Sequence, residues 1–285
     1  AETLQSSVAA LEQRGPSLGL GDADTLLGLG ITPVTVAPWG AEGHRDRSGG
    51  GPWAEELLGE AKPEVIYNTA TGFTADTFEQ VTAADPTQII AVNQAVDAHT
   101  KESLEEIAPT TVKPNGYEDW QVPWKKQVES IADAVGKEDE GDKLIDDTEK
   151  AFEEFRHEHA ELQDKSAAIV MPYDGKIGLY TSEDGRGQFI EDLGMEIPDA
   201  LQGDGGSFFV DIAPENYAKL NQVDYLFVLD YNGSSAALKK DKTFQGLDIV
   251  KDDRVRYLDT DTGNAMSMPN PVTIPWAIDK FEEKL

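Results

Sequence analysis

The chain has 285 residues, of which 39% are hydrophobic and 8% aromatic, enough apolar material for two folded domains. Its 54 acidic and 24 basic residues give a formal net charge of −30, which excludes nucleic acid and anionic membrane surfaces as partners because both repel a polyanion. No stretch approaches the roughly 20 consecutive apolar residues of a membrane-spanning helix. The chain contains no cysteine, which excludes disulfides, thiolate metal sites and cysteine nucleophiles.

Short β-rich runs alternate with helical patterns in the first half of the chain. Helices are predicted for 22–29, which starts at a capping-type Asp, and for 74–84, which ends before Pro86. Strands separated by helices indicate a parallel sheet with helices on both faces. The runs rich in Val, Ile and Thr that predict buried strands are 33–39, 64–68, 87–92 and 110–113.

A long amphipathic helix is predicted for residues 138–163. Apolar residues recur there at steps of three and four, and acids and bases fill the positions between them. About 25 residues at a rise of 1.5 Å would span roughly 37 Å, the width of a small domain. A helix of this length between two α/β halves could join them as a rigid connector.

The second half repeats the alternation of strands and helices. We therefore predict an α/β fold of two Rossmann-like lobes with parallel sheets, joined by a single long interdomain helix. The predicted domains are an N-terminal lobe at 1–137, the connecting helix at 138–164 and a C-terminal lobe at 165–285. The predicted strands are 167–172, 176–181, 224–229 and 254–258, and the predicted helices are 187–193, 214–220 and 275–284.

Residues 19–24 (GLGDAD) begin like the glycine-rich turn of a dinucleotide-binding fold. The third glycine of that pattern is replaced by Asp24, whose carboxylate would lie where a pyrophosphate needs space and no negative charge. A tight turn between a strand and a helix explains the segment better than a nucleotide site.

Neither the histidines nor the acidic motifs predict a metal site or an enzyme. His157 and His159 lie two residues apart on the long predicted helix and point to different faces, while His44 and His99 lie in distant loops. Residues 259–263 (DTDTG) begin like a calcium loop, but no glutamate follows at the required position, so we predict a solvated turn. Because GxSxG, P-loop and HExxH motifs are absent from the sequence, we expect no enzyme and no cofactor.

Seven segments match one family in order along the chain. They are 21–39 (GDADTLLGLGITPVTVAPW), 52–58 (PWAEELL), 72–91 (GFTADTFEQVTAADPTQIIA), 104–111 (LEEIAPTT), 186–194 (RGQFIEDLG), 211–229 (DIAPENYAKLNQVDYLFVL) and 269–279 (PNPVTIPWAID). Together they resemble the iron-siderophore (ferric hydroxamate type) solute-binding proteins of ABC importers, the class whose two lobes are joined by one long helix. One departure is the first strand, because Pro16 within 14–20 cannot donate to a sheet.

The resemblance implies a transport function. Such a protein captures a ferric siderophore in the cleft between its lobes and delivers it to the transmembrane subunits of an ABC permease. The chelate would be a ligand and not a cofactor, and we expect the protein to be a monomer. Because the chain starts at Ala1 and not at Met, we expect a processed extracytoplasmic protein, lipid-anchored on the outer face of the cell membrane or periplasmic.

The candidate ligand-binding residues lie in loops at the carboxyl ends of the predicted strands, where α/β sheets generally bind ligands. Aromatic walls with a few cationic or amide donors suit a bulky chelate with a polar rim and apolar flanks. Trp53 could equally anchor its helix in the core, and the loop cations Arg45 and Arg47 could equally serve solubility. The candidates are Trp39, Arg45, Arg47, Trp53, Phe73 and Gln94 in the first lobe, and Arg186, Tyr231, Met266 and Met268 in the second.

Two acids are candidates for docking on the permease. The resemblance places a helix-borne acid on each lobe, and these positions correspond to Glu79 in DTFEQV and Glu215 in APENYA. Such a pair could meet basic pockets on a two-fold permease. Alternatively, each is one solvated glutamate among many.

Two other functions stay open. The same fold could bind haem or a corrinoid, and haem would require an axial ligand, for which His44, His99, Tyr180 and Tyr231 are the candidates. An enzyme on a two-lobed α/β scaffold is the other alternative. Turnover of a substrate, as opposed to stoichiometric binding, would identify it.

Overall fold

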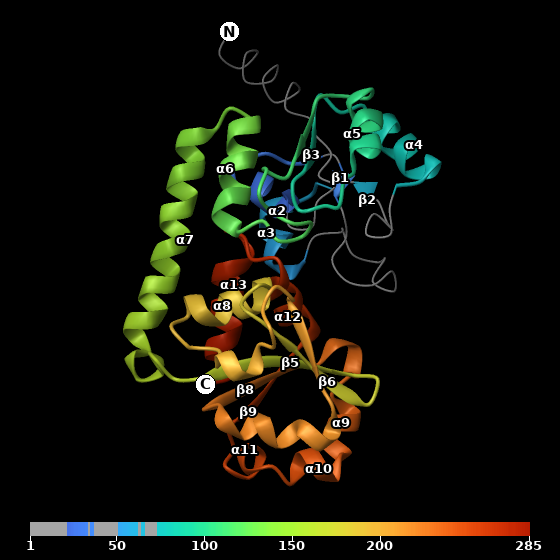
Figure 1. Ribbon diagram of the computed structural model, residues 1–285. Coiled ribbons are helices and arrows are strands. Elements are labelled where there is room, and N and C mark those ends of the chain that lie inside the picture. Colours follow the sequence, from blue (N-terminus) through green and yellow to red (C-terminus); the bar gives the residue numbers. More distant parts are fainter. Residues whose placement is uncertain (1–21, 34, 37–50, 62–63, 66–72) are drawn as a thin grey trace. The chain divides into compact units, whose positions relative to one another are not determined.

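The computed structural model describes residues 22–33, 35–36, 51–61, 64–65 and 73–285 (Figure 1). The chain divides into two compact units. Unit 1 comprises Ala1–Thr148 and Asn270–Thr273, and unit 2 comprises Glu149–Pro269 and Ile274–Leu285.

The long connecting helix is present as α7 (Glu138–Glu158), and the unit boundary falls within it. It is shorter than the predicted 138–163, because His159 leaves helical geometry with φ −117° and ψ 53°, and a 3₁₀ turn, η4 (Ala160–Leu162), follows. The predicted apolar stripe is confirmed in the buried side chains of Phe152 and Phe155. Within the described part of the chain, no helix is both long and apolar enough to cross a membrane.

Unit 1 contains two pairs of parallel strands. β1 (Thr35–Val36) pairs with β2 (Glu64–Val65), and β3 (Ile89–Ala91) pairs with β4 (Thr110–Val112). All four lie within the predicted runs. The unit also contains α2 (Asp22–Gly28), η2 (Pro52–Ala54), α3 (Glu55–Leu58), α4 (Ala75–Ala83), α5 (Ala98–Glu105) and α6 (Trp124–Ala134).

The side chains of β3 alternate between two apolar clusters of unit 1. Ile90 packs with Leu26 of α2 and Ile131 of α6. Ile89 packs on the other face with Val81 of α4 and Leu104 of α5. Helices therefore cover both faces of this strand. This agrees with the prediction made from the alternation of strands and helices along the sequence.

Unit 2 contains a five-stranded mixed sheet in the order β7-β6-β5-β8-β9. β5, β8 and β9 are parallel neighbours, whereas β6 is antiparallel to both β5 and β7. The wholly parallel sheet predicted for this lobe is thus corrected at one edge, because only Asp174 and Gly175 separate β5 from β6 and a two-residue hairpin joins antiparallel strands. The strands are β5 (Ala167–Tyr173), β6 (Lys176–Tyr180), β7 (Phe209–Ile212), β8 (Tyr225–Leu229) and β9 (Val255–Leu258).

Helices cover both faces of the unit 2 sheet (Figure 1). On one face, Phe227 of β8 packs against Phe281, with ring centroids 4.4 Å apart. On the other, Leu226 and Val228 join a cluster with Phe244. The first face carries α8 (Gly185–Asp192), α12 (Thr260–Ser267) and α13 (Thr273–Glu282), and the second carries α9 (Ala236–Lys240), α10 (Lys242–Gln245) and α11 (Asp248–Lys251).

Two local predictions for unit 2 are corrected. Residues 214–220, predicted as an α-helix, lie in the 3₁₀ helix η6 (Pro214–Gln222). Residues 259–263 are not a solvated turn: Asp259 is the N-cap of α12, and its carboxylate accepts a 2.8 Å hydrogen bond from the backbone N–H of Thr262.

Candidate ligand-binding site

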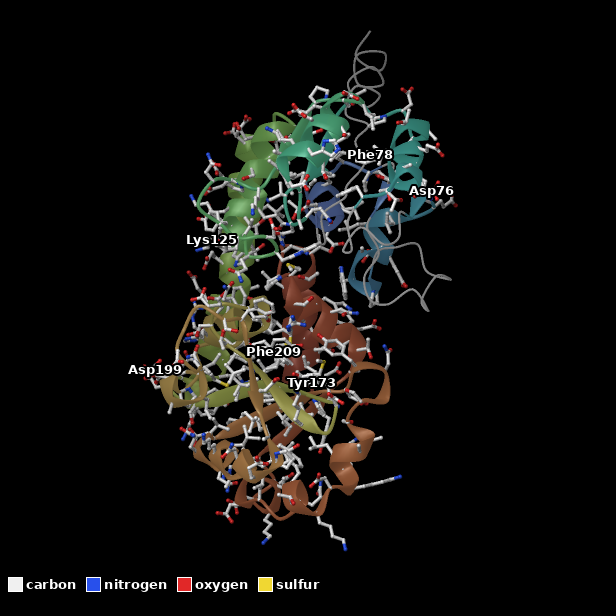
Figure 2. All side chains as sticks on the ribbon, turned by 45° about the vertical axis from the view of Figure 1, so that its right-hand side comes forward. Asp76, Phe78, Lys125, Tyr173, Asp199 and Phe209 are labelled. Atoms are coloured by element: carbon white, nitrogen blue, oxygen red, sulfur yellow. The ribbon has the colours of Figure 1, made fainter. Side chains whose placement is uncertain are left out.

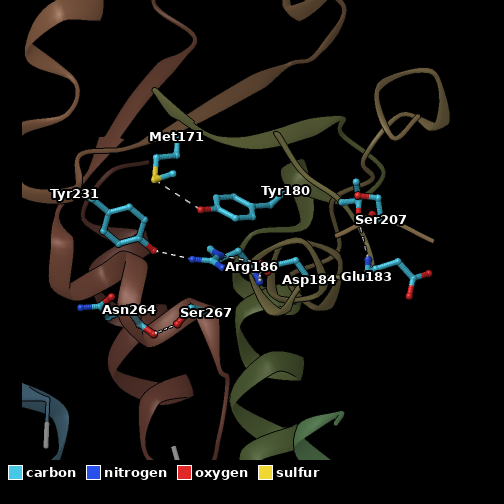
Figure 3. A network of polar contacts seen from close by, with 10 residues as sticks. Met171, Tyr180, Glu183, Asp184, Arg186, Ser207, Tyr231, Asn264 and Ser267 are labelled. Atoms are coloured by element: carbon cyan, nitrogen blue, oxygen red, sulfur yellow. Dashed lines mark hydrogen bonds and ion pairs between the residues drawn. The ribbon is translucent and has the colours of Figure 1, made fainter. Parts of the chain in front are cut away.

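Arg186 is the centre of a polar network at the start of α8 (Figure 3). Its Nε lies 2.8 Å from Oδ1 of Asp184, and its Nη2 lies 3.0 Å from Oδ2 of the same carboxylate. Nη1 donates a 3.0 Å hydrogen bond to the hydroxyl oxygen of Tyr231. Arg186 Cζ lies 3.8 Å from the ring centroid of Tyr180, whose hydroxyl is 3.7 Å from Met171 Sδ. Paired hydrogen bonds and stacking together fix the orientation of the guanidinium group.

Two glycines allow the chain to place Arg186 there. Asp184 caps α8 by accepting a 2.8 Å hydrogen bond from the backbone N–H of Arg186. A Cβ atom at Gly185 would overlap a backbone carbonyl group of α12, and one at Gly187 would overlap the carbonyl oxygen of Thr181. Because both neighbours are backbone atoms, side-chain movement cannot relieve either overlap. Residues 184–187 (DGRG) therefore need glycine on both sides of the arginine, because other backbone segments approach closely at both positions.

The network keeps Arg186 charged and leaves it donors for a ligand. Burial lowers the pKa of Arg186, but Tyr231 and Asp184 raise it by more. Burial raises the pKa of both Tyr180 and Tyr231, so both phenols are protonated at neutral pH. Three of the five N–H donors of the guanidinium group are used within the described part of the chain. The Arg186 side chain is 16% exposed, so part of it is accessible from solvent.

Three aromatic side chains form a row beside this network, which we call the aromatic row: Tyr173, Phe209 and Tyr180. The ring centroid of Phe209 lies 5.5 Å from that of Tyr173 and 5.1 Å from that of Tyr180. Phe209 and Tyr173 are labelled in Figure 2. A Cβ atom at Gly178 of β6 would overlap the Phe209 ring, so this glycine lets the ring lie against the sheet. The row extends from half-buried Tyr173 to the Tyr180 ring under Arg186. Apolar surface thus adjoins a fixed cation.

The structure brings two of the sequence-predicted residues of unit 2 into direct contact, namely Arg186 and Tyr231. Met266 is fully buried within α12, which packs on α8. Met268, at the end of α12, is half-buried. Of these four residues, Arg186 and Tyr231 therefore share one polar network, and Met268 is partly exposed.

Trp53 of unit 1 is 7% exposed and has a polar partner in the core. Its ring Nε1 donates a 3.0 Å hydrogen bond to Oδ2 of Asp24, and Nδ2 of Asn270 donates to the same oxygen at 3.1 Å. Asp24 of α2 thus joins two other segments to its helix: η2 through Trp53, and the residues before α13 through Asn270. These contacts account for the carboxylate at the third glycine position of the GLGDAD pattern.

The other predicted residues of unit 1 lie at separate places. Gln94 is buried after β3 and is 1% exposed. Phe73 is half-buried before α4, with its ring 5.8 Å from that of Phe78. Trp39, Arg45 and Arg47 lie outside the described residues, as does His44.

The two predicted docking acids are both exposed. Glu79 on α4 lines a surface groove between α4 and α5, together with Phe78 and Glu106. Glu215 is the second residue of η6. Each carboxylate is accessible to a partner.

Comparison with known proteins identifies the family. The profile described as periplasmic binding protein matches residues 17–262. This chain belongs to that family. As a periplasmic binding protein, it is 26% identical over 220 residues to the probable siderophore-binding lipoprotein YfiY of Bacillus subtilis (strain 168). The match covers 75% of this chain and 62% of YfiY, so the chain spans less than two thirds of the length of this curated relative.

Solved structures of periplasmic binding proteins match over almost the whole chain. PiaA of Streptococcus pneumoniae TIGR4, an iron uptake ABC transporter substrate-binding protein, is 26% identical with a TM-score of 0.76, covering 96% of this chain and 92% of PiaA. PiaA in complex with ferrichrome gives 25% identity and a TM-score of 0.77, with 95% and 91% covered. A periplasmic solute binding protein from Mycobacterium smegmatis str. MC2 155 gives 26% identity and a TM-score of 0.82, with 96% and 91% covered.

The sequence of this periplasmic binding protein did not lead us to predict that the three residues of the aromatic row lie together. β7, which carries Phe209, was not predicted, and Tyr180 was considered only as a haem ligand. A signal was present nonetheless: Gly178 lies inside the predicted strand 176–181, and a glycine in a strand interior often marks the close approach of another group.

Proposed function

We propose that this protein is the extracytoplasmic solute-binding component of an ABC importer and that it captures a ferric siderophore. The observation that carries the proposal is the Arg186 network, a fixed cation with two remaining N–H donors beside the aromatic row. In a chain with a net charge of −30, an anionic ligand requires a charged N–H donor, and Arg186 supplies one while Asp184 holds it in place. The YfiY and PiaA matches support the same ligand class, and YfiY supports a lipid anchor.

The chemistry of the site suits a ferric chelate. Fe³⁺ is a hard cation and is held by oxygen donors that carry negative charge, so the surface of the chelate combines anionic oxygens with apolar flanks. The free N–H groups of Arg186 would donate to those oxygens, and the aromatic row would contact the flanks.

The test measures the binding of ferrichrome and of a panel of catecholate and carboxylate ferric chelates, through the quenching of tryptophan fluorescence. We expect saturable, submicromolar binding of at least one chelate. Arg186→Ala should weaken that binding by about 1.5–3 kcal/mol, roughly tenfold to more than a hundredfold, because hydrogen bonds to charged groups contribute this much. Arg256→Ala, at a partly exposed arginine of β9, is the matched control and should bind normally.

Two outcomes would contradict the proposal. If the whole panel leaves the fluorescence unchanged, the siderophore assignment is wrong, and haemin added to the same protein would then test the haem alternative through a shift of its Soret band. If Arg186→Ala folds and binds with an unchanged dissociation constant, Arg186 is not in the ligand site.

We also propose that Glu79 and Glu215 dock the loaded protein on its permease. Both carboxylates are exposed, and Glu79 borders a groove that a partner side chain could enter. Uptake of iron from the bound chelate in cells producing the importer should fall in Glu79→Ala and Glu215→Ala while chelate binding stays unchanged. Exposed Glu102→Ala and Glu153→Ala are the controls for units 1 and 2. Equal uptake by all four variants would contradict docking through these acids.

A further inference from the structure

His159 lies immediately after α7, in unit 2, with its ring held in place. The ring centroids of His159 and Phe155 are 4.4 Å apart, and the His159 side chain is 21% exposed. Its backbone N–H donates to the carbonyl oxygen of Phe155, which fixes the residue at the helix end. Here the backbone carbonyl groups carry partial negative charge that favours a cation.

The two ring nitrogens of His159 face different carboxylates. Nδ1 lies 3.4 Å from Oε1 of Glu161, within hydrogen-bond distance. Nε2 lies 3.7 Å from Oε1 of Glu282 on α13, which is too long for a hydrogen bond. When Nδ1–H donates to Glu161, the tautomer is set so that Nε2 carries its lone pair toward Glu282. Histidines that ligate metals are oriented in this way, by a second carboxylate on the far nitrogen.

We propose that Glu158, His159 and Glu282 bind a divalent transition-metal ion of the Zn²⁺ class. One ligand atom from each of the three lies within 4.8 Å of the others. Two ligands of a tetrahedral ion with bonds of about 2.0–2.2 Å lie roughly 3.3–3.6 Å apart, close to the separation of His159 Nε2 and Glu282 Oε1. Three protein ligands leave a fourth position for water. The donor set of one imidazole and two carboxylates suits Zn²⁺ better than Ca²⁺ or Mg²⁺, which prefer oxygen alone.

The proposed metal site is separate from the Arg186 site and has a different consequence. Glu158 is the last residue of α7 and His159 follows it directly, whereas Glu282 is the last residue of α13, so one ion would cross-link the ends of the two helices within unit 2. The same helices already meet through the rings of Phe155 and Phe281, whose centroids are 6.3 Å apart. Because a metal that binds only the folded state stabilises it, Zn²⁺ should strengthen the attachment of the C-terminal helix.

The test uses the complete chain without a histidine tag, freed of metal by chelation. Zn²⁺ is titrated by calorimetry, and Co²⁺ is titrated by its visible absorption, which reports the ligand geometry. We expect one Zn²⁺ per chain and a thermal midpoint that rises with Zn²⁺ concentration. His159→Ala and Glu282→Gln should each weaken binding at least tenfold. His157→Ala is the matched control, since His157 is an exposed histidine two residues away, and it should bind Zn²⁺ as the unaltered protein does.

Three results would overturn the proposal: no saturable Zn²⁺ binding, equal losses in His157→Ala and His159→Ala, or unchanged binding in Glu282→Gln. If His159→Ala does not fold, Glu282→Gln decides the question, because it preserves side-chain size at a half-buried position. Chelate binding at the Arg186 site is measured on the same samples and should not depend on Zn²⁺.

Discussion

Gly263 on α12 gives the Tyr231 ring room to reach Arg186. A Cβ atom at this glycine would lie 2.8 Å from Cε1, Cζ and the hydroxyl oxygen of Tyr231. Because that oxygen accepts the hydrogen bond from Arg186, the alanine variant should displace the phenol and break the contact. An alanine within a helix is otherwise favoured over glycine by roughly 0.5–1 kcal/mol.

Gly263→Ala should therefore separate stability from binding. We expect the free energy of unfolding to stay level or rise, while the chelate that binds the unaltered protein binds less tightly, by about 1 kcal/mol for one lost hydrogen bond. Urea unfolding and fluorescence titration measure the two quantities. Tyr231→Phe, which loses only the hydroxyl, is the control and should match the loss of affinity. Unchanged affinity in both variants would show that the Arg186–Tyr231 contact does not prepare the site.

The residues of the site differ in how far the sequence could predict them. Arg186 stood out because it lies before a helix in a segment that matches the family, and Tyr231 because it follows a predicted strand. Their hydrogen bond could not be predicted, since 45 residues separate them and Tyr231 lies in η7 (Tyr231–Gly233), which meets α8 where both pack on α12. For Trp53 the sequence left two roles open, a ligand-binding residue and a core anchor of its helix. Its hydrogen bond to Asp24, 29 residues away, was not visible in the sequence.

At the scale of elements, Asp22 attaches α2 to β3 in unit 1. Its fully buried carboxylate accepts hydrogen bonds from the backbone N–H groups of Val92 at 2.8 Å and Asn93 at 3.3 Å. Gln127 Nε2 of α6 donates to it at 2.9 Å. One side chain thus accepts from three donors in two parts of the fold, the chain after β3 and α6, which explains an acid at the start of a buried helix.

Asp22→Ala should leave these buried donors without an acceptor. Each unsatisfied buried donor costs about 1–3 kcal/mol, so we expect the free energy of unfolding to fall by about 3 kcal/mol or more. Urea unfolding followed by circular dichroism measures the change. Asp76→Ala, at an exposed acid in the first turn of α4, should lose less than about 1 kcal/mol. Similar small losses in the two variants would contradict this role of Asp22.

Most elements that were predicted correctly have strong local patterns. α6 was missed although Trp124, Val128 and Ile131 recur at steps of four and three, whereas other missed elements have weak patterns. The strands β1–β6, β8 and β9 lie in runs rich in apolar or β-branched residues, bounded by turn residues. α5 buries only Leu104, so its periodicity is too weak to detect. β7 follows a glycine-rich stretch and is an edge strand that pairs with β6 among the described strands.

For the whole molecule, the sequence predicted the α/β class, a long helix in the middle and the family, and all three are confirmed. The boundary between the two units is set by tertiary packing and cannot be predicted from the local sequence pattern. Because the unit boundary falls inside α7, no change of composition marks it, and Asn270–Thr273 joins unit 1 from a distant part of the sequence through the contact of Asn270 with Asp24.

The net charge of −30 makes the stability of the folded chain depend on salt. Like charges repel one another more strongly in the compact state, and salt screens that repulsion over a Debye length of about 10 Å at 0.1 M and about 3 Å at 1 M. Screening also weakens attractive ion pairs, but those between described residues are mostly at the surface, as in Lys143–Asp147 and Lys126–Glu129. Exposed pairs of this kind contribute little.

We therefore expect the thermal midpoint at pH 7.5 to rise between 0.05 and 1 M NaCl. A gain of about 1–2 kcal/mol would raise the midpoint by roughly 2–8 °C for a chain of this size. The same titration near the sequence pI of about 4.3 is the control, since the net charge there is close to zero and salt has little repulsion to screen. A midpoint that falls with salt at pH 7.5, or rises equally at both pH values, would mean that charge repulsion is not what limits the stability of this protein.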